Sequence, residues 1–265
     1  MKYKKISQSL LKSYNDYKGK QLCGLKLKAQ YFDNVEFGGS EAMDLGNYFE
    51  YKATGSLPRN GRIPHPRVSY KGTKREQISA PYVRALESAE LFKKIVKHYN
   101  IEIKDVGLKL ESEYKQGELD IWGTMNGRPC IIDLKYSGLI DNKWDERGWE
   151  TESLPYKERL MVQAVHYKML VKENYGLNYD EFDFLFMVFS QSEVKNVKFI
   201  RVNIDDDAFE IHDKHIKSVF YQINTMDIEK DFKAYPSVKA CNKCPLYDKC
   251  EHKVDVPIIE DIYYG

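Results

Sequence analysis

The sequence lacks the features that mark membrane, secreted or strongly basic proteins. No apolar run approaches the roughly 20 residues of a membrane-spanning helix. The opening stretch MKYKKISQSLLKSYNDYKGK has lysines but no continuous apolar segment after them, so we expect no secretory signal and no membrane partner, and therefore a cytoplasmic protein. The formal net charge is only +1, so any binding of nucleic acid must come from local basic patches.

Cysteine is also scarce. Cys130 lies in the apolar run RPCIIDL, where we expect a small buried residue. Cys241, Cys244 and Cys250 form a C-x₂-C-x₅-C pattern, a spacing at which thiolates bind a soft metal. Cys23 is the natural fourth ligand if the two ends of the chain converge. An odd total of five cysteines argues against a disulfide framework, but zinc, an iron–sulfur cluster and free thiols all remain open on ligand chemistry alone.

Hydrophobic periodicity predicts an α/β protein. Helical spacing is found in segments 6–20, 40–55, 81–100, 154–176 and 205–224. Strand character is found in segments 106–114, 117–125, 128–136, 180–190 and 194–204. This order predicts a central mixed sheet flanked by helices, with a helical N-terminal extension.

Local signals sharpen these expectations. Ser40 is expected to cap the second helix and Gly55 to end it. The pair Asn126–Gly127 predicts a tight hairpin between two of the strands. No hydrophobic break forces a division, so we expect one domain: a helical part at 1–100, a core at 101–225, and a cysteine region with a tail at 226–265.

The stretch GELDIWGTMNGRPCIIDLKYSG, residues 117–138, places charged residues in runs that otherwise read as buried strands. Asp133 and Lys135 point to one face of their strand, and Asp120 lies on the preceding strand within cross-strand reach. Two facing carboxylates repel, and a divalent cation such as Mg²⁺ removes that conflict. The alternative is a salt bridge on a solvated sheet face.

Two helical segments add candidates. Glu50 follows Gly46 by one helical turn in GNYFEYKATG, and Gly46 would allow that helix to approach another backbone closely. Gln163 and Tyr167 in MVQAVHYKML share one helix face. His166 has no partner histidine at ligand spacing, so we expect an ordinary surface or packing role for it.

The order Glu50, GELD, IIDLK and QAVHY resembles that of the PD-(D/E)XK nuclease superfamily, in its RecB-like exonuclease branch. In that branch a helical Glu or His, the Asp of a G-x-x-D segment, a D/E-x-K strand and a Q-x-x-x-Y helix form one active site on a restriction-endonuclease-like core. Leu119 precedes the aspartate here, where the family name has proline. The resemblance implies catalytic roles for Glu50, Asp120, Asp133, Lys135, Gln163 and Tyr167.

The resemblance also implies the metals. Mg²⁺ or Mn²⁺ would be held by Glu50, Asp120, Asp133 and the backbone carbonyl of Leu134, with Glu111 or Glu113 as competitors for the place of Glu50. The cysteine pattern is similar to that of AddB-type nuclease domains and the CRISPR-associated adaptation exonuclease, in which four cysteines hold a [4Fe–4S] cluster. That cluster would bind Cys23, Cys241, Cys244 and Cys250 here, with Zn²⁺ as the alternative.

The segment 58–77 is basic and rich in glycine and proline, so we expect a loop. It is either a solvated surface loop or a loop that binds DNA phosphates. The candidate DNA-binding residues are Arg59, Arg62, Arg67, Lys71, Lys74 and Arg75.

Together these features predict a metal-dependent DNA exonuclease that acts on ends or single strands in recombination, repair or phage DNA processing. No G-x-x-x-x-G-K-[ST] segment is present, so a helicase or recombination partner would have to supply unwinding. One alternative is a non-catalytic protein that binds DNA ends, although the intact Asp133-x-Lys135 pair argues against it. Another is a CRISPR-adaptation-like subunit that needs a partner, with the tail VPIIEDIYYG either as its docking segment or as a disordered end.

Overall fold

The computed structural model of the chain describes residues 4–58, 61–71, 75–142, 148–150 and 158–255. These residues fall into two compact units, one of residues 39–214 and one of residues 4–38 together with 215–255. Two compact units can belong to one domain, so the expectation of a single domain stays a prediction.

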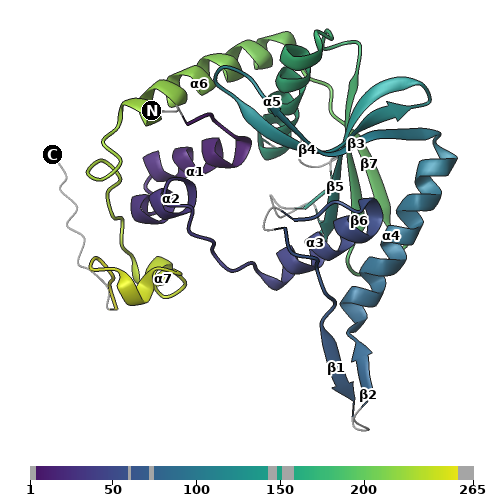
Figure 1. Ribbon diagram of the computed structural model, residues 1–265, viewed down its shortest axis with the longest axis horizontal. Coiled ribbons are helices and arrows are strands. Elements are labelled where there is room, and N and C mark those ends of the chain that lie inside the picture. The colour runs from purple at the N-terminus through teal and green to yellow at the C-terminus, as the bar shows by residue number, and fades with distance from the viewer. Residues whose placement is uncertain (1–3, 59–60, 72–74, 143–147, 151–157, 256–265) are drawn as a thin grey trace. The chain divides into compact units, whose positions relative to one another are not determined.

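A mixed five-stranded sheet organises residues 39–214 (Figure 1). Its strands, in spatial order, are β3 (Ile101–Glu111), β4 (Gln116–Met125), β5 (Arg128–Ser137), β6 (Asp183–Ser190) and β7 (Val197–Arg201). All neighbours are antiparallel except β5 and β6, which are parallel and are connected through helix α5 (Glu158–Tyr175). A parallel pair needs such a crossover, because its two strands start at the same edge.

Helices cover both faces of the sheet. Helices α3 (Glu41–Thr54) and α4 (Ala80–His98) pack on one face, where side chains such as Phe49 and Phe92 meet Ile132 and Leu134 of β5. Helix α5 packs on the other face with Tyr167 and Leu170, against a cluster that includes Ile131. This arrangement confirms the predicted α/β fold with a mixed sheet flanked by helices. Neighbouring β5 residues therefore face opposite layers.

The predicted local signals hold. Ser40 caps α3, because its Oγ accepts a hydrogen bond of 3.2 Å from the Met43 backbone N–H, and Gly55 ends the helix with a φ of 82°. Asn126 and Gly127 have φ values of 51° and 81° and join Met125 to Arg128, as a tight hairpin requires.

The second unit joins the two ends of the described chain. It contains α1 (Gln8–Lys18), α2 (Gly24–Tyr31), the later part of α6 (Asp206–Thr225), α7 (Val238–Cys241) and the 3₁₀ helix η1 (Tyr247–Lys249). The Tyr17 hydroxyl donates to the carbonyl of Asp231 at 2.7 Å, and the Lys4 backbone N–H donates to Asn224 at 2.7 Å. Residues more than 200 positions apart are thus hydrogen-bonded.

Several expectations were wrong. Segment 58–77 is not all loop: β1 (Val68–Lys71) and β2 (Arg75–Ile78) form an antiparallel pair, and β1 alternates apolar and polar residues as a strand does. Strand β3 begins at Ile101, five residues earlier than predicted, and a register shift between Ile103 and Asp105 obscured its alternation. Gly46 makes no close approach, since an added Cβ would meet no atom within 4 Å.

Among the described residues, no helix is both long enough and apolar enough to cross a membrane.

Candidate functional site

Asp120 and Asp133 lie side by side on β4 and β5. Ile121 is paired with Ile132, and the residues next to this pair are Asp120 and Asp133. The charge of Asp133 acts on Asp120, so the two carboxylates lie close together. The Asp120 Oδ2 accepts a hydrogen bond of 2.8 Å from the backbone N–H of Leu134. The strand register therefore fixes one carboxylate against the backbone of its neighbour.

Lys135 and Gln163 both bind Asp133. The Lys135 ammonium forms an ion pair with Oδ1 of Asp133, and the Gln163 amide Nε2 donates to Oδ2. Asp133 is only 1% exposed, whereas Lys135 is 31% exposed and so borders solvent. Three residues from a strand and a crossover helix thus meet.

The carboxylates disfavour each other's ionisation. Burial raises the pKa of Asp120 well above its ordinary value, and the nearby charge of Asp133 raises it further. Burial likewise raises the pKa of Asp133, which the positive charge of Lys135 opposes. Burial also disfavours the charged form of Lys135, but the negative charges of Asp133 and Asp120 outweigh it and raise that pKa. A further positive charge at the site would therefore stabilise the ionised form of both carboxylates.

Glu50 acts on the same site from α3. Its charge raises the pKa of both Asp120 and Lys135, as expected of a carboxylate near each of them. The neighbouring Phe49 stacks on Tyr136 of β5, with ring centroids 4.8 Å apart, which holds α3 against that strand. Of the two competing glutamates, Glu111 ends β3 and Glu113 follows it, and both are exposed. These observations favour Glu50 as the third carboxylate, which stays a prediction.

Gly117 lets α5 lie directly on β4, a role that its sequence position alone did not reveal. A Cβ at Gly117 would lie 2.8 Å from Leu170 Cδ1 and 3.0 Å from Tyr167 Cε1, so a side chain there would displace the helix. Glycine inside a strand pattern often marks such a close approach, which is the signal that could have found it. Tyr167 is 8% exposed, and its ring lies over this glycine.

Two further predicted contributions concern the backbone and the basic segment. Leu134 lies between Asp133 and Lys135 and is in register with Met187 of β6, and the metal-binding role of its carbonyl stays a prediction. Arg67 forms ion pairs with Glu41 at 3.3 Å and Asp44 at 2.8 Å. A DNA phosphate would have to compete with these two acids for it.

The remaining basic candidates are only partly described. Arg62 is exposed, and Lys71 is paired with Arg75 across the β1–β2 ladder. Arg59, Lys74 and the tail 256–265 lie outside the described residues.

Cys23, Cys241, Cys244 and Cys250 line one cavity of about 430 Å³ in the second unit. Four lysines line the same cavity; they are Lys26, Lys239, Lys243 and Lys253. All four cysteines are free thiols. Cys130, in contrast, is 1% exposed within the sheet, and burial raises the pKa of its thiol to about 12, as an inert packing residue requires.

Close backbone packing brings Cys23 to this cavity. The Gly24 backbone N–H donates to the Lys233 carbonyl at 3.0 Å, and an added Cβ on Gly24 would lie 2.4 Å from that oxygen. Among the described residues, no three His, Cys, Asp or Glu side chains lie close enough together to hold a metal ion. Neither the carboxylates nor the thiols are therefore already arranged as a closed metal shell.

No sequence-family model matches the chain, and no curated protein is significantly similar to it in sequence. A solved structure described as a candidate exonuclease from Eubacterium rectale is similar with a TM-score of 0.63 and 17% identity, over 96% of this chain and 91% of that one. An alkaline exonuclease from Laribacter hongkongensis has a TM-score of 0.47 and 13% identity, over 85% and 90% of the two chains. A phage-related exonuclease from Haemophilus somnus has a TM-score of 0.46 and 14% identity, over 84% and 96%. The last two are too distant to carry an argument, and the first shows that this chain shares the fold of the Eubacterium rectale protein.

Proposed function

We propose that this chain is a metal-dependent DNA nuclease that hydrolyses phosphodiester bonds, and within that class an exonuclease. The observation that carries the proposal is the meeting of Asp120, Asp133, Lys135 and Gln163 at one sheltered site on which the charge of Glu50 also acts. A fold shared with a protein described as a candidate exonuclease supports it.

The donor set suits a hard divalent cation. Two buried carboxylates have raised pKa values, and Lys135 supplies only one positive charge near them. A Mg²⁺ or Mn²⁺ ion bound by Asp120, Asp133, Glu50 and the Leu134 carbonyl would neutralise this excess and supply a metal-activated water for attack on phosphorus.

The other residues position the Asp133 carboxylate and stabilise negative charge on the phosphate. Lys135 stays protonated because its pKa is raised, so it offers a positive charge to the phosphate as negative charge develops there. Gln163 holds Oδ2 of Asp133 and so fixes the orientation of that carboxylate. Tyr167, one helical turn further along α5, offers a hydroxyl and a ring beside Gly117.

DNA is the proposed partner, either as an end or as a single strand. Arg62, Arg67, Lys71 and Arg75 are proposed to meet its phosphates, together with Arg59 and Lys74 outside the described residues. A recombination or helicase partner would supply the unwinding that this chain has no motif to perform.

A [4Fe–4S] cluster is proposed for the cysteine cavity, with Zn²⁺ as the alternative. Four thiols around one cavity, with lysines beside them, suit an anionic thiolate centre. Its role would be structural, because Cys23 and Cys241 come from remote parts of the chain and a crosslink between such parts restricts the unfolded chain.

A cleavage assay with a matched pair of variants tests the nuclease. End-labelled single- and double-stranded DNA would be incubated with wild type, Asp133→Asn and Asp183→Asn, with and without Mg²⁺ or Mn²⁺. Asp183 is a suitable control because it is also a sheltered strand aspartate, 14% exposed, whose partners Arg128 and Arg201 lie away from the site.

Metal-dependent shortening of labelled ends by wild type and Asp183→Asn, but not by Asp133→Asn, is expected. Equal cleavage by Asp133→Asn and wild type would refute the assignment of the site. Internal cuts without shortening would keep the nuclease and reject the exonuclease.

A further inference from the structure

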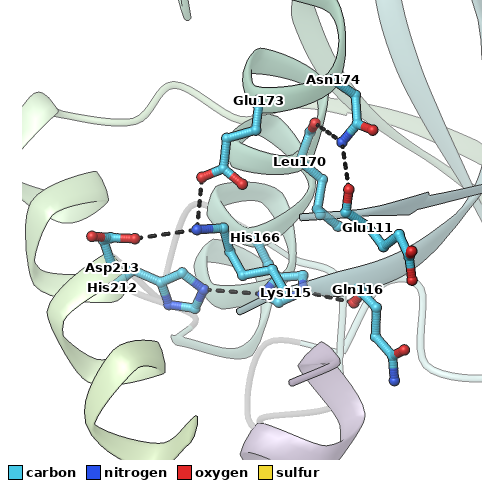
Figure 2. A network of polar contacts seen from close by, with 9 residues as sticks. All are labelled: Glu111, Lys115, Gln116, His166, Leu170, Glu173, Asn174, His212 and Asp213. Carbon is cyan, nitrogen blue, oxygen red and sulfur yellow. Dashed lines mark hydrogen bonds and ion pairs between the residues drawn. The ribbon is translucent and has the colours of Figure 1, made fainter. Parts of the chain in front are cut away.

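A polar network joins α5 to the turn between β3 and β4 (Figure 2). Positions 166, 170, 173 and 174 of α5 are spaced to lie on one helix face. All of them meet residues of the segment 111–117, which leads directly into β4. That segment ends three residues before Asp120, so the network lies close to the proposed catalytic carboxylates along the chain.

His166 is the centre of this network. It is fully buried, its Nε2 is 3.0 Å from the Gln116 carbonyl oxygen, and its Nδ1 is 3.3 Å from Nε2 of His212 on α6. A carbonyl only accepts hydrogen bonds, so Nε2 of His166 carries the proton and Nδ1 accepts one from His212. The two bonds therefore specify one neutral tautomer.

The surroundings keep this imidazole neutral. Burial lowers the pKa of His166 to about 4, the hydrogen bond with Gln116 opposes that shift, and the positive charge of Lys115 adds to it. Lys115 faces the ring from the β3–β4 turn, while Glu173 of α5 and Asp213 of α6 bind Lys115. At neutral pH the ring thus retains both of its hydrogen bonds.

Lys115 strengthens the same junction. Its side chain is 2% exposed, and its Nζ lies 2.7 Å from Glu173 and 3.2 Å from Asp213. Asn174 adds a hydrogen bond of 3.2 Å to the carbonyl of Glu111. The turn is therefore held to α5 at several points along the helix, and α6 is held to the same turn.

These bonds fix the position of the helix that carries Gln163. Gln163 precedes His166 by one helical turn, and Gln116 precedes Asp120 by four residues on β4. A helix and a strand are stiff over such lengths, so a bond between His166 and Gln116 sets where Gln163 meets Asp133. Gly117 allows the close approach, and His166 sets its register.

We propose that His166 is a positioning residue for the nuclease reaction: it locks α5 to the start of β4 so that Gln163 holds the Asp133 carboxylate in the orientation that catalysis needs. This inference rests on the proposed function.

Three variants test it. His166→Leu removes both hydrogen bonds, whereas His166→Gln can still donate to Gln116 and accept from His212. Lys168→Met is the control, because Lys168 lies on the same helix, is 7% exposed, and donates to the carbonyls of Tyr179 and Phe182 rather than to the β3–β4 turn. Each variant would be assayed for kcat and KM at a temperature at which it is fully folded.

We expect His166→Leu to lower kcat by roughly 10- to 100-fold, the effect of misplacing a catalytic group by about 1 Å, with little change in KM for DNA. His166→Gln should recover most of this loss, and Lys168→Met should keep the wild-type kcat. The side-chain amide NMR signal of Gln163, identified by its loss in Gln163→Ala, should move in His166→Leu and stay in place in the other two variants.

Equal losses of kcat in His166→Leu and Lys168→Met would mean that the helix is merely destabilised, and would overturn the proposal. An unmoved Gln163 signal in His166→Leu would also overturn it. If wild type cleaves no DNA with any metal, the proposed nuclease function fails, and the Gln163 signal alone then decides whether His166 positions Gln163. If His166→Leu does not fold, Asn174→Ala, at an exposed position, takes its place and should move the same signal in the same direction.

Discussion

The carboxylate site and the cysteine cavity are built in opposite ways. The carboxylates lie on long paired strands, where Asp120 is held by the Leu134 backbone and Asp133 by Gln163. The cysteines lie at the ends of short elements: Cys23 precedes α2, Cys241 ends α7 and Cys250 follows η1. Regular structure holds the first site in place without a ligand. The second is held by the backbone hydrogen bonds of short turns and helix ends, so a bound metal that joined these elements would contribute more to its structure.

The largest expected effect separates chemistry from stability at the carboxylate site. Lys135→Met should lower the cleavage rate by on the order of 10²- to 10³-fold, the range for loss of one electrostatic group at a reacting centre. Lys198 lies on β7 and forms ion pairs with Asp141 and Glu150, so Lys198→Met is the control and should keep the wild-type rate. Initial rates on labelled DNA would check this, and equal rates for the two variants would remove Lys135 from the site.

At the cysteine cavity we expect the opposite order of effects, with stability lost first and activity second. Cys241→Ser should remove the proposed cluster and lower stability by about 3 kcal/mol, as expected for losing a crosslink between remote segments. Activity should fall only as the protein unfolds.

Thermal melting, with iron, sulfide and zinc analysis of protein purified without oxygen, would measure this effect. Wild type should be brown and hold about four iron and four sulfide per chain. Cys130→Ala is the matched control and should keep the metal, because Cys130 is buried in the sheet. A colourless wild type that holds one zinc per chain would replace the iron–sulfur assignment by zinc. Full thermal stability of metal-free Cys241→Ser would refute a structural role for the metal.

A smaller effect tests whether backbone packing holds the carboxylate site. Gly117→Ala should cost about 1–3 kcal/mol, because its Cβ would press on Leu170 and Tyr167, and it should also lower the cleavage rate. Gly46→Ala has free space and lies within a helix, so it should be neutral or stabilise by about 0.5–1 kcal/mol. Urea unfolding of both variants would decide this, and a harmless Gly117→Ala would show that α5 is not held as closely as proposed.

The smallest effect is a change in the pH dependence of stability. The pKa of Asp120 is raised in the folded state, so its contribution to stability is present at acid pH and is lost as pH rises above about 4 and the buried carboxyl ionises. In metal-free protein, Asp120→Asn should therefore flatten the decline of stability above that pH, and Mg²⁺ should reduce the decline in wild type. Melting curves from pH 4 to pH 8 would test this. A steeper decline in Asp120→Asn would contradict the direction of the shift.

Local sequence determined the elements and the residues available for chemistry. Helical and alternating periodicity predicted the five sheet strands, although not all of their ends, and Asn126–Gly127 predicted the hairpin, because these signals depend on neighbouring residues alone. The alternation along β5 placed Asp133 and Lys135 on one face for the same reason. The basic segment was the exception, since its glycines and prolines hid the short strands β1 and β2.

Tertiary structure alone decided which of those residues meet. The pairing of Ile121 with Ile132 brings Asp120 close to Asp133, and the crossover through α5 brings Gln163 to the Asp133 carboxylate. The roles of Gly117 and His166 depend on a helix from elsewhere in the chain lying against β4. A glycine within a strand indicates a close approach, but no local pattern identifies the helix that approaches. The four cysteines line one cavity because residues 4–38 and 215–255 pack together. Sequence spacing determines which side chains share a face of a helix or strand, but long-range packing determines the distance between elements. A catalytic or metal site needs both.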